Sequence, residues 1–241
     1  MYFVINATSI AKKFPDNPGV YFFMGKRNKI LYAGRATSLR SRVASYFNKD
    51  TLFSRGPIIA RMVLESRDVK FIKTDSVLEA IILEANLIKK HQPPYNTKEK
   101  SDKSFNYIVV TKEDFPRVLV VRGKDIDFKK RYAIFGPFPQ GAVLKEALKI
   151  IRKIFPFRDK CSPGAGKPCF DRQIGLCSGV CTGEISKEEY RKITSNIKLF
   201  LSGKKKTIIK KLAKEMAECA KRYEFEKAGS IKKTIFSLKH I

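Results

Sequence analysis

Four of the five cysteines in this 241-residue chain lie between residues 161 and 181, among several glycines and prolines. This composition predicts a loop-rich module at residues 161–185. In a reducing compartment such a tight cluster favours metal ligation over disulfides, and four thiolates suit either Zn²⁺ or an iron–sulfur cluster. The ligands would be Cys161, Cys169, Cys177 and Cys181, and the alternative is four unligated thiols. Cys219 stands apart at an apolar helical position, where we expect a plain buried thiol.

The chain carries a large positive charge, with 50 lysines and arginines, 23 aspartates and glutamates, and a net charge of +27. A surplus of this size repels itself unless a polyanion is near, so nucleic acid is the first partner to consider and an anionic membrane surface the second. The N-terminal segment lacks the pattern of a secretory signal, and no apolar run is long enough to span a bilayer. We therefore expect a cytoplasmic protein that has no membrane partner.

Hydrophobic periodicity divides the chain into four regions. We expect a small α/β domain at residues 1–98, an intermediate α/β region at 99–160, the four-cysteine module at 161–185 and helices alone at 186–241. The first region is predicted to contain, in order, strand 19–23, turn 26–28, strand 30–33, a helix near 39–46, strand 69–73 and helix 76–90. The second is predicted to contain strands 107–110 and 117–121, turn 136–139 and helix 142–155.

Two local signals support these helices. Ser76 is followed three residues later by Glu79, a capping-box pattern, and Pro93-Pro94 is expected to end the same helix. Residues 204–241 are predicted to form a helical hairpin, with apolar side chains lining both arms. These side chains are Ile208, Leu212 and Met216 on one arm and Ile231, Ile235 and Leu238 on the other.

Glu84 is the most informative single residue, because its neighbours one helical turn away are apolar. A carboxylate on an apolar face is costly unless it is paired or bound to a cation. The structural alternative is that Glu84 pairs with a nearby lysine or arginine, or reaches the edge of the domain. Arg42 shares its helix face with Leu39 and Tyr46, and a guanidinium there could hold a phosphate or could simply be exposed. Tyrosines on strands are usually core residues, but Tyr21 and Tyr32 could converge with Arg42 and Glu84 on one cleft.

The order of these residues resembles the GIY-YIG nuclease family, with Gly19-Val20-Tyr21, Tyr32-Ala33-Gly34, Arg42, Glu84 and Asn96 at plausible spacing. Nearly the whole chain is similar to the N-terminal half of the UvrC family. The stretches that carry this likeness are 18–21, 32–47, 83–89, 94–96, 132–139, the cysteine module and the C-terminal hairpin. The resemblance implies an α+β fold, in which a small GIY-YIG domain has a three-stranded antiparallel sheet and flanking helices.

The resemblance implies a metal-dependent DNA endonuclease, which hydrolyses a phosphodiester bond 3′ to a lesion during nucleotide excision repair. By this likeness Glu84 would hold one Mg²⁺ or Mn²⁺, and Arg42 would stabilise the charge on the phosphate. Tyr21 and Tyr32 would position or deprotonate the water, while Tyr46 and Asn96 would support the site. Arg35 stands where the family usually has lysine, and it keeps the charge without the compact ammonium.

The resemblance also implies further partners. The four cysteines would hold a 4Fe–4S cluster, with structural Zn²⁺ as the alternative. The hairpin, through residues 223–228, resembles the UVR motif and would dock UvrB on damaged double-stranded DNA, with UvrA acting upstream. Family members continue into a second half that makes the 5′ cut, so the chain is either a fragment or a short protein that makes one cut. Two rival functions are a non-catalytic adaptor of UvrB and DNA, and a stand-alone GIY-YIG nuclease.

Overall fold

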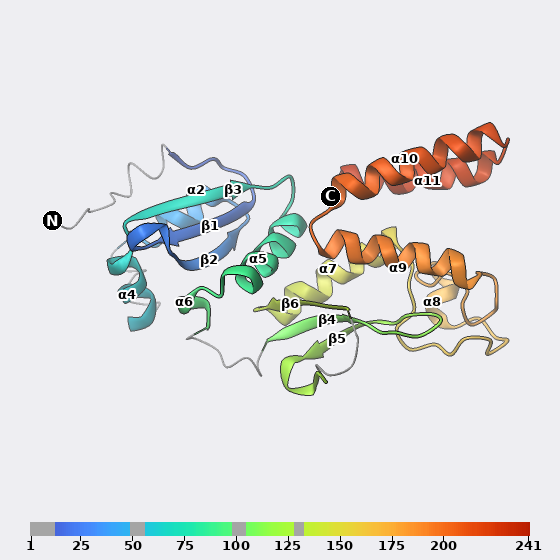
Figure 1. Ribbon diagram of the computed structural model, residues 1–241, viewed down its shortest axis with the longest axis horizontal. Coiled ribbons are helices and arrows are strands. Elements are labelled where there is room, and N and C mark those ends of the chain that lie inside the picture. The colour runs from blue at the N-terminus through green and yellow to red at the C-terminus, as the bar shows by residue number, and fades with distance from the viewer. Residues whose placement is uncertain (1–12, 49–55, 98–104, 128–132) are drawn as a thin grey trace. The chain divides into compact units, whose positions relative to one another are not determined.

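The computed structural model describes residues 13–48, 56–97, 105–127 and 133–241. By its internal contacts the chain divides into two units (Figure 1). The first comprises Met1–Phe105 with Gly136–Phe138, and the second comprises Asn106–Phe135 with Pro139–Ile241.

The first unit is built on a three-stranded antiparallel sheet, as the sequence predicts. Strand β1 (Gly19–Met24) lies in the middle, between β2 (Ile30–Ala36) and β3 (Asp68–Lys73) (Figure 1). The hairpin between β1 and β2 turns through η1 (Lys26–Asn28), where two residues adopt positive φ angles. The sheet is therefore a hairpin with one added strand, and β1 is its only central strand.

The two faces of β1 are both covered, so all six of its residues are buried. Tyr21 and Phe23 point into a cluster with α2 (Leu39–Ala44) and α4 (Pro57–Glu65). Val20 and Phe22 point the other way, into a cluster with α5 (Val77–His91). This alternation follows from the two-residue period of a strand. Because β1 contributes alternate side chains to both clusters, the position of each residue along the strand decides which cluster its side chain enters.

Helix α5 begins where the sequence predicts. The Ser76 hydroxyl accepts a hydrogen bond from Glu79 N at 3.1 Å. The Glu79 carboxylate accepts from Asp75 N at 3.0 Å, one residue earlier than a standard capping box would place it. The helix ends at His91, and Gln92 takes the left-handed conformation before the prolines. A further short helix, α6 (Pro94–Thr97), and α4 were not predicted.

A second sheet has the order β5-β4-β6, and it belongs to the second unit except for Gly136–Phe138 at the end of its last strand, which group with the first. Its strands are β4 (Asn106–Val110), β5 (Val118–Arg122) and β6 (Ala133–Phe138), and η3 (Gly123–Asp125) follows β5. The turn predicted at 136–139 is wrong over most of its length, because residues 136–138 belong to β6. Strand β6 is an edge strand, where a proline without an N–H group is tolerated.

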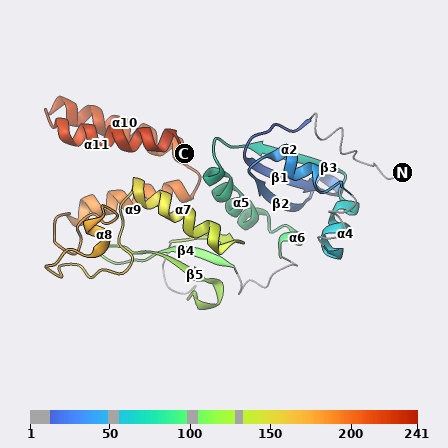
Figure 2. The same cartoon turned by 180° about the vertical axis from the view of Figure 1, so that it is seen from behind.

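Helices make up the rest of the second unit. They are α7 (Gly141–Ile154), α8 (Phe170–Gln173), α9 (Lys187–Leu201), α10 (Lys205–Lys221) and α11 (Phe225–Lys239). Helices α10 and α11 lie side by side in both views (Figure 2). Of the predicted hairpin stripe, Ile208, Leu212 and Leu238 are buried, whereas Met216, Ile231 and Ile235 are half-buried. Cys219 is buried as expected. None of the described helices combines the length and apolarity that crossing a bilayer requires.

Candidate active site and cysteine cluster

Three tyrosines and an arginine meet on one face of the first sheet. The hydroxyls of Tyr21 and Tyr46 are hydrogen-bonded at 2.8 Å, and Arg42 Nε donates to the Tyr21 hydroxyl at 3.3 Å. The ring centroid of Tyr32 lies 6.2 Å from that of Tyr21. Tyr21 and Tyr46 are buried, whereas Arg42 is exposed. Arg42 is therefore exposed to solvent while its Nε contacts the buried hydroxyl of Tyr21.

The register of the β1–β2 hairpin explains why Tyr21 takes this position. Tyr21 pairs with Gly34, and its side chain lies against the Gly34 backbone. A Cβ atom at Gly34 would come within 2.5 Å of the Tyr21 hydroxyl oxygen. Gly19 is equally constrained, because a Cβ there would lie 2.4 Å from the carbonyl oxygen of Ile72 on β3. Both glycines are required by close approach rather than by backbone conformation.

Glu84 is buried on α5, as its apolar surroundings predict, and it is 8% exposed. Arg35 contacts both of its carboxylate oxygens. The Arg35 backbone N–H donates to Oε1 at 3.1 Å, and Arg35 Nε lies 3.1 Å from Oε2. The pairing alternative considered for Glu84 is thus present here, with Arg35 as the partner. Burial nevertheless raises the pKa of Glu84 to about 7, because the attraction of Arg35 offsets only part of the lost hydration.

Burial also sets the pKa values of two tyrosines in the cluster. It raises the pKa of Tyr21 and of Tyr32 well above the usual value, and the negative charge of Glu84 adds to the effect at Tyr32. Burial alone would lower the pKa of Arg42, but the neighbouring tyrosines together raise it by a larger amount. The net result is a raised pKa, so this guanidinium keeps its charge. Both phenols are therefore neutral near pH 7, and either one could act as a base only if a further cation stabilised its phenolate.

Asn96 fixes the strand on which these groups meet. Its Oδ1 accepts from Ala33 N and its Nδ2 donates to Ala33 O, both at 2.8 Å. Ala33 lies between Tyr32, which joins the tyrosine cluster, and Gly34, which supports Tyr21. Asn96 therefore holds β2 in place, and its side-chain amide satisfies backbone groups that the sheet edge leaves open.

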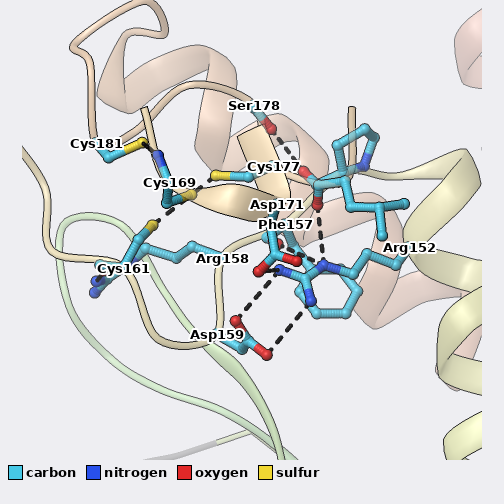
Figure 3. Close-up of polar contacts among 12 residues, drawn as sticks. Arg152, Phe157, Arg158, Asp159, Cys161, Cys169, Asp171, Cys177, Ser178 and Cys181 are labelled. Atoms are coloured by element: carbon cyan, nitrogen blue, oxygen red, sulfur yellow. Dashed lines mark hydrogen bonds and ion pairs between the residues drawn. The ribbon is translucent and has the colours of Figure 1, made fainter. Parts of the chain in front are cut away.

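The four clustered cysteines come together in the second unit. All four Sγ atoms lie within 4.8 Å of one another, and those of Cys161 and Cys177 are 3.9 Å apart (Figure 3). Cys169 N lies 3.4 Å from Cys181 Sγ, in the geometry of a backbone donor to sulfur. Burial and the neighbouring Cys177 raise the pKa of Cys161 to about 12. Because thiolates so close together repel one another, a cation between them would favour the loss of their protons.

Two arginines, which the sequence analysis did not single out, anchor the cysteine module. Arg152 Nε donates to the carbonyls of Phe157 and Leu176 at 3.0 and 2.9 Å. Its guanidinium also pairs with Asp159 and Asp171, at 3.3 and 2.9 Å (Figure 3). Because Arg152 belongs to α7, these contacts fasten the cysteine loop to that helix.

Arg158 is the second anchor, and it is 4% exposed. It donates to the carbonyl of Cys161 at 2.6 Å and to that of Phe115 at 2.7 Å, and it pairs with Glu113. Its contacts join the cysteine module to the loop between β4 and β5. The sequence gives no local signal for this role, because Arg158 and Glu113 are 45 residues apart.

Comparison with known proteins gives a consistent result over both units. Residues 17–97 match the UvrC-like GIY-YIG domain, and residues 105–200 match the middle domain of UvrC/Cho excinucleases. The first unit is thus a GIY-YIG domain. The UvrABC system protein C of Acetivibrio thermocellus is 43% identical over 95% of this chain, and that of Clostridium kluyveri is 42% identical over the same share.

The chain belongs to the UvrC family. It spans 37% of the length of each of these two relatives. Among solved structures, the GIY-YIG N-terminal endonuclease domain of UvrC from Thermotoga maritima, described as bound to its catalytic divalent cation, magnesium, is 35% identical. The alignment covers 38% of this chain and 96% of that one, with a TM-score of 0.33.

The contact between Tyr21 and Gly34 generates a prediction with a matched control. Gly34→Ala should lower the free energy of unfolding by about 1–3 kcal/mol, because the new methyl group must displace the buried Tyr21 ring. Gly229→Ala, in open space on α11, should instead raise it by about 0.5–1 kcal/mol. Urea unfolding of the two variants beside the parent chain measures both changes. Equal effects from the two substitutions would contradict the packing described here.

Proposed function

We propose that this chain is a metal-dependent endonuclease of the UvrC type, which hydrolyses one phosphodiester bond 3′ to a DNA lesion in complex with UvrB. The observation that carries the proposal is that β2 connects a buried carboxylate with a cluster of tyrosines and an exposed arginine. The Arg35 backbone on β2 binds Glu84, and the charge of Glu84 acts on Tyr32 of the same strand and on Arg42. The family membership supports it. A cytoplasmic location follows from the proposed substrate, chromosomal DNA.

The donor set at Glu84 fits a divalent cation. A single carboxylate is sufficient for Mg²⁺ or Mn²⁺, since Mg²⁺ keeps several water ligands. The raised pKa of Glu84 means that Arg35 does not fully compensate its buried charge, so a second cation would be favoured there. When bound, such an ion supplies an activated water and neutralises charge on the phosphate. Arg35, which now contacts both carboxylate oxygens, would then have to share or release Glu84.

The remaining residues have separate roles in the proposed reaction. The exposed Arg42 guanidinium can contact a phosphate directly and stabilise the charge that develops on it. Tyr21 or Tyr32 would orient the attacking water, and would accept its proton only as a phenolate whose own proton has already left to solvent and whose charge the bound cation or Arg42 stabilises. Tyr46 holds the Tyr21 hydroxyl in place. Asn96 acts on the position of β2, so it is a positioning residue.

We further propose that the cysteine cluster holds a metal centre. The family resemblance favours a 4Fe–4S cluster. Zn²⁺ is the alternative, because four thiolates can ligate either group and all four Sγ atoms lie within 4.8 Å of one another. In either case the centre has a structural role, fastening a loop that packs little apolar surface of its own.

The partner proposed for the hairpin is UvrB. At the turn between α10 and α11, Tyr223 and Phe225 are 81% and 65% exposed, and their rings pack edge to face. Exposed aromatic rings of this kind are typical of a surface that a partner protein covers. UvrA would act upstream, and damaged double-stranded DNA is the substrate. The lysines of the hairpin could also contact that DNA.

The nuclease proposal predicts a result that separates it from its two rivals. With UvrA, UvrB, ATP and Mg²⁺, the chain should nick a lesion-bearing duplex once, 3′ to the lesion. Glu84→Gln should reduce this nicking at least about 100-fold, because the reaction loses its charge stabilisation, whereas Glu146→Gln on α7 should have no effect. End-labelled duplexes measure the cut. UvrB binding without nicking would favour the adaptor, and cleavage of undamaged DNA without UvrB would favour a stand-alone nuclease.

The pKa of Glu84 predicts how metal binding depends on pH. Mg²⁺ binds the carboxylate, and below its pKa of about 7 the free site is protonated. The affinity for Mg²⁺ should therefore fall by about tenfold for each pH unit below that value and level off above it. Calorimetric titration of the chain with Mg²⁺ at several pH values checks this, with Glu84→Gln as the control that should not bind. An affinity that is constant across neutral pH would contradict the assignment.

Metal analysis tests the cysteine cluster. The purified chain should contain either about four irons, with a broad visible absorption, or about one zinc. Cys161→Ser should lose most of this metal, because only three thiolates remain. Cys219→Ser, at a buried thiol outside the cluster, should keep it. Equal metal content in the two variants, or none in the parent chain prepared without oxygen, would refute a metal centre at these cysteines.

A further inference from the structure

The second unit contains a groove that is separate from both sites described above. Its volume is about 770 Å³, and its walls are the end of β4, the following loop and one face of α9. The side chains of Lys112, Arg191 and Lys198 line it, together with hydroxyl-bearing residues such as Ser195. The groove is thus a concave surface with cations on both walls.

The charges of this groove are poorly compensated from within the protein. Lys112 and Lys198 form no ion pair among the described residues. Arg191 lies 3.4 Å from Asp114, but that carboxylate is closer to Lys187, at 2.6 Å. The one acidic residue in the lining, Glu113, already pairs with Arg117 and Arg158. Three cations and one carboxylate line the groove, so it keeps a net positive charge that Asp114 offsets only in part.

The cations follow the axis of α9 on one wall. Arg191, Ser195 and Lys198 are spaced by four and three residues, which puts them on the same helix face. They extend over about 10 Å of the helix, the length of about three base-pair steps of B-DNA. Lysine, arginine and serine are common donors to phosphate oxygens. This spacing matches a repeating polyanion better than a single small anion.

The opposite wall is held in a fixed shape. The Tyr190 hydroxyl donates to Pro116 O at 2.9 Å, and the Tyr190 hydroxyl oxygen accepts a hydrogen bond from Arg158 N at 2.9 Å. Arg158 in turn binds the carbonyl of Phe115. A groove whose wall is already ordered loses less conformational entropy when it binds a ligand.

We propose that this groove binds the phosphate backbone of double-stranded DNA. The inference rests on the proposed function in one respect, that the chain acts on DNA. An acidic protein is the less favoured occupant, because protein interfaces centre on apolar and aromatic residues. Among the residues that the structure describes, none of the large exposed apolar side chains lines this groove. The groove reads no bases and supplies a second anchor, on a different unit from the proposed nuclease site.

The test measures duplex binding as a function of salt. All variants carry Glu84→Gln, so that no cleavage occurs and the outcome does not depend on nuclease activity. Lys112→Ala with Lys198→Ala should reduce the slope of log affinity against log salt by about 1.8, since each phosphate contact contributes about 0.9. Lys112→Arg with Lys198→Arg should keep the parent slope. The matched control, Lys145→Ala with Lys153→Ala on α7, removes the same charge from exposed positions outside the groove.

The outcomes distinguish this inference from the proposed function. A lower slope in the groove variant and an unchanged slope in the control support the inference, provided that the metal content of both variants equals that of the parent. Equal slopes in the two alanine variants overturn it, whether or not the chain with Glu84 intact nicks DNA. Parent-like DNA binding combined with loss of UvrB binding would also overturn it, and would assign the groove to an acidic protein.

Discussion

The close approach of Tyr21 to Gly34 is the constraint on which the candidate active site depends. It requires a glycine on β2, and it fixes the Tyr21 hydroxyl where Tyr46 and Arg42 can both reach it. Because β1 is covered on both faces, a slip of one residue in the register would turn Tyr21 toward α5 and bury the wrong side chains. The same packing that stabilises the domain therefore places its polar groups.

Within the described part of the chain, each unit contains one charged group that is buried against a partner from a distant segment. In the first unit this group is Glu84 with Arg35, and in the second it is Arg158 with Glu113. Removing one member of such a pair typically costs about 3–5 kcal/mol, because the remaining charge stays buried. The two pairs differ in an important respect. Arg158 has its other donors satisfied by carbonyl groups, whereas Glu84 keeps a raised pKa and so retains capacity for a further cation.

The sequence predicts the parts of this structure that depend on local signals. The three strands of the first sheet, the start of α5 at Ser76 and the hairpin stripe through Ile208 and Leu238 all follow from short-range patterns. Strand β6 was missed because its Gly-Pro sequence is typical of a turn, and pairing with β4 overrides that preference. The burial of Glu84 was predicted, but its partner was not, because Arg35 is 49 residues away and only the folded sheet brings the two together.

Arg158 links two places that the sequence keeps far apart, the carbonyl of Cys161 and the loop that forms one wall of the groove. Such a shared contact would couple the proposed metal centre to the proposed DNA groove, and coupling between binding equilibria is reciprocal. If loss of metal from the cysteines loosens that loop, then any ligand that orders the loop must strengthen metal retention by the same factor. The cysteine centre and the groove would then form a single cooperative element of the second unit, in which metal binding at the cysteines changes the affinity of the groove for its ligand.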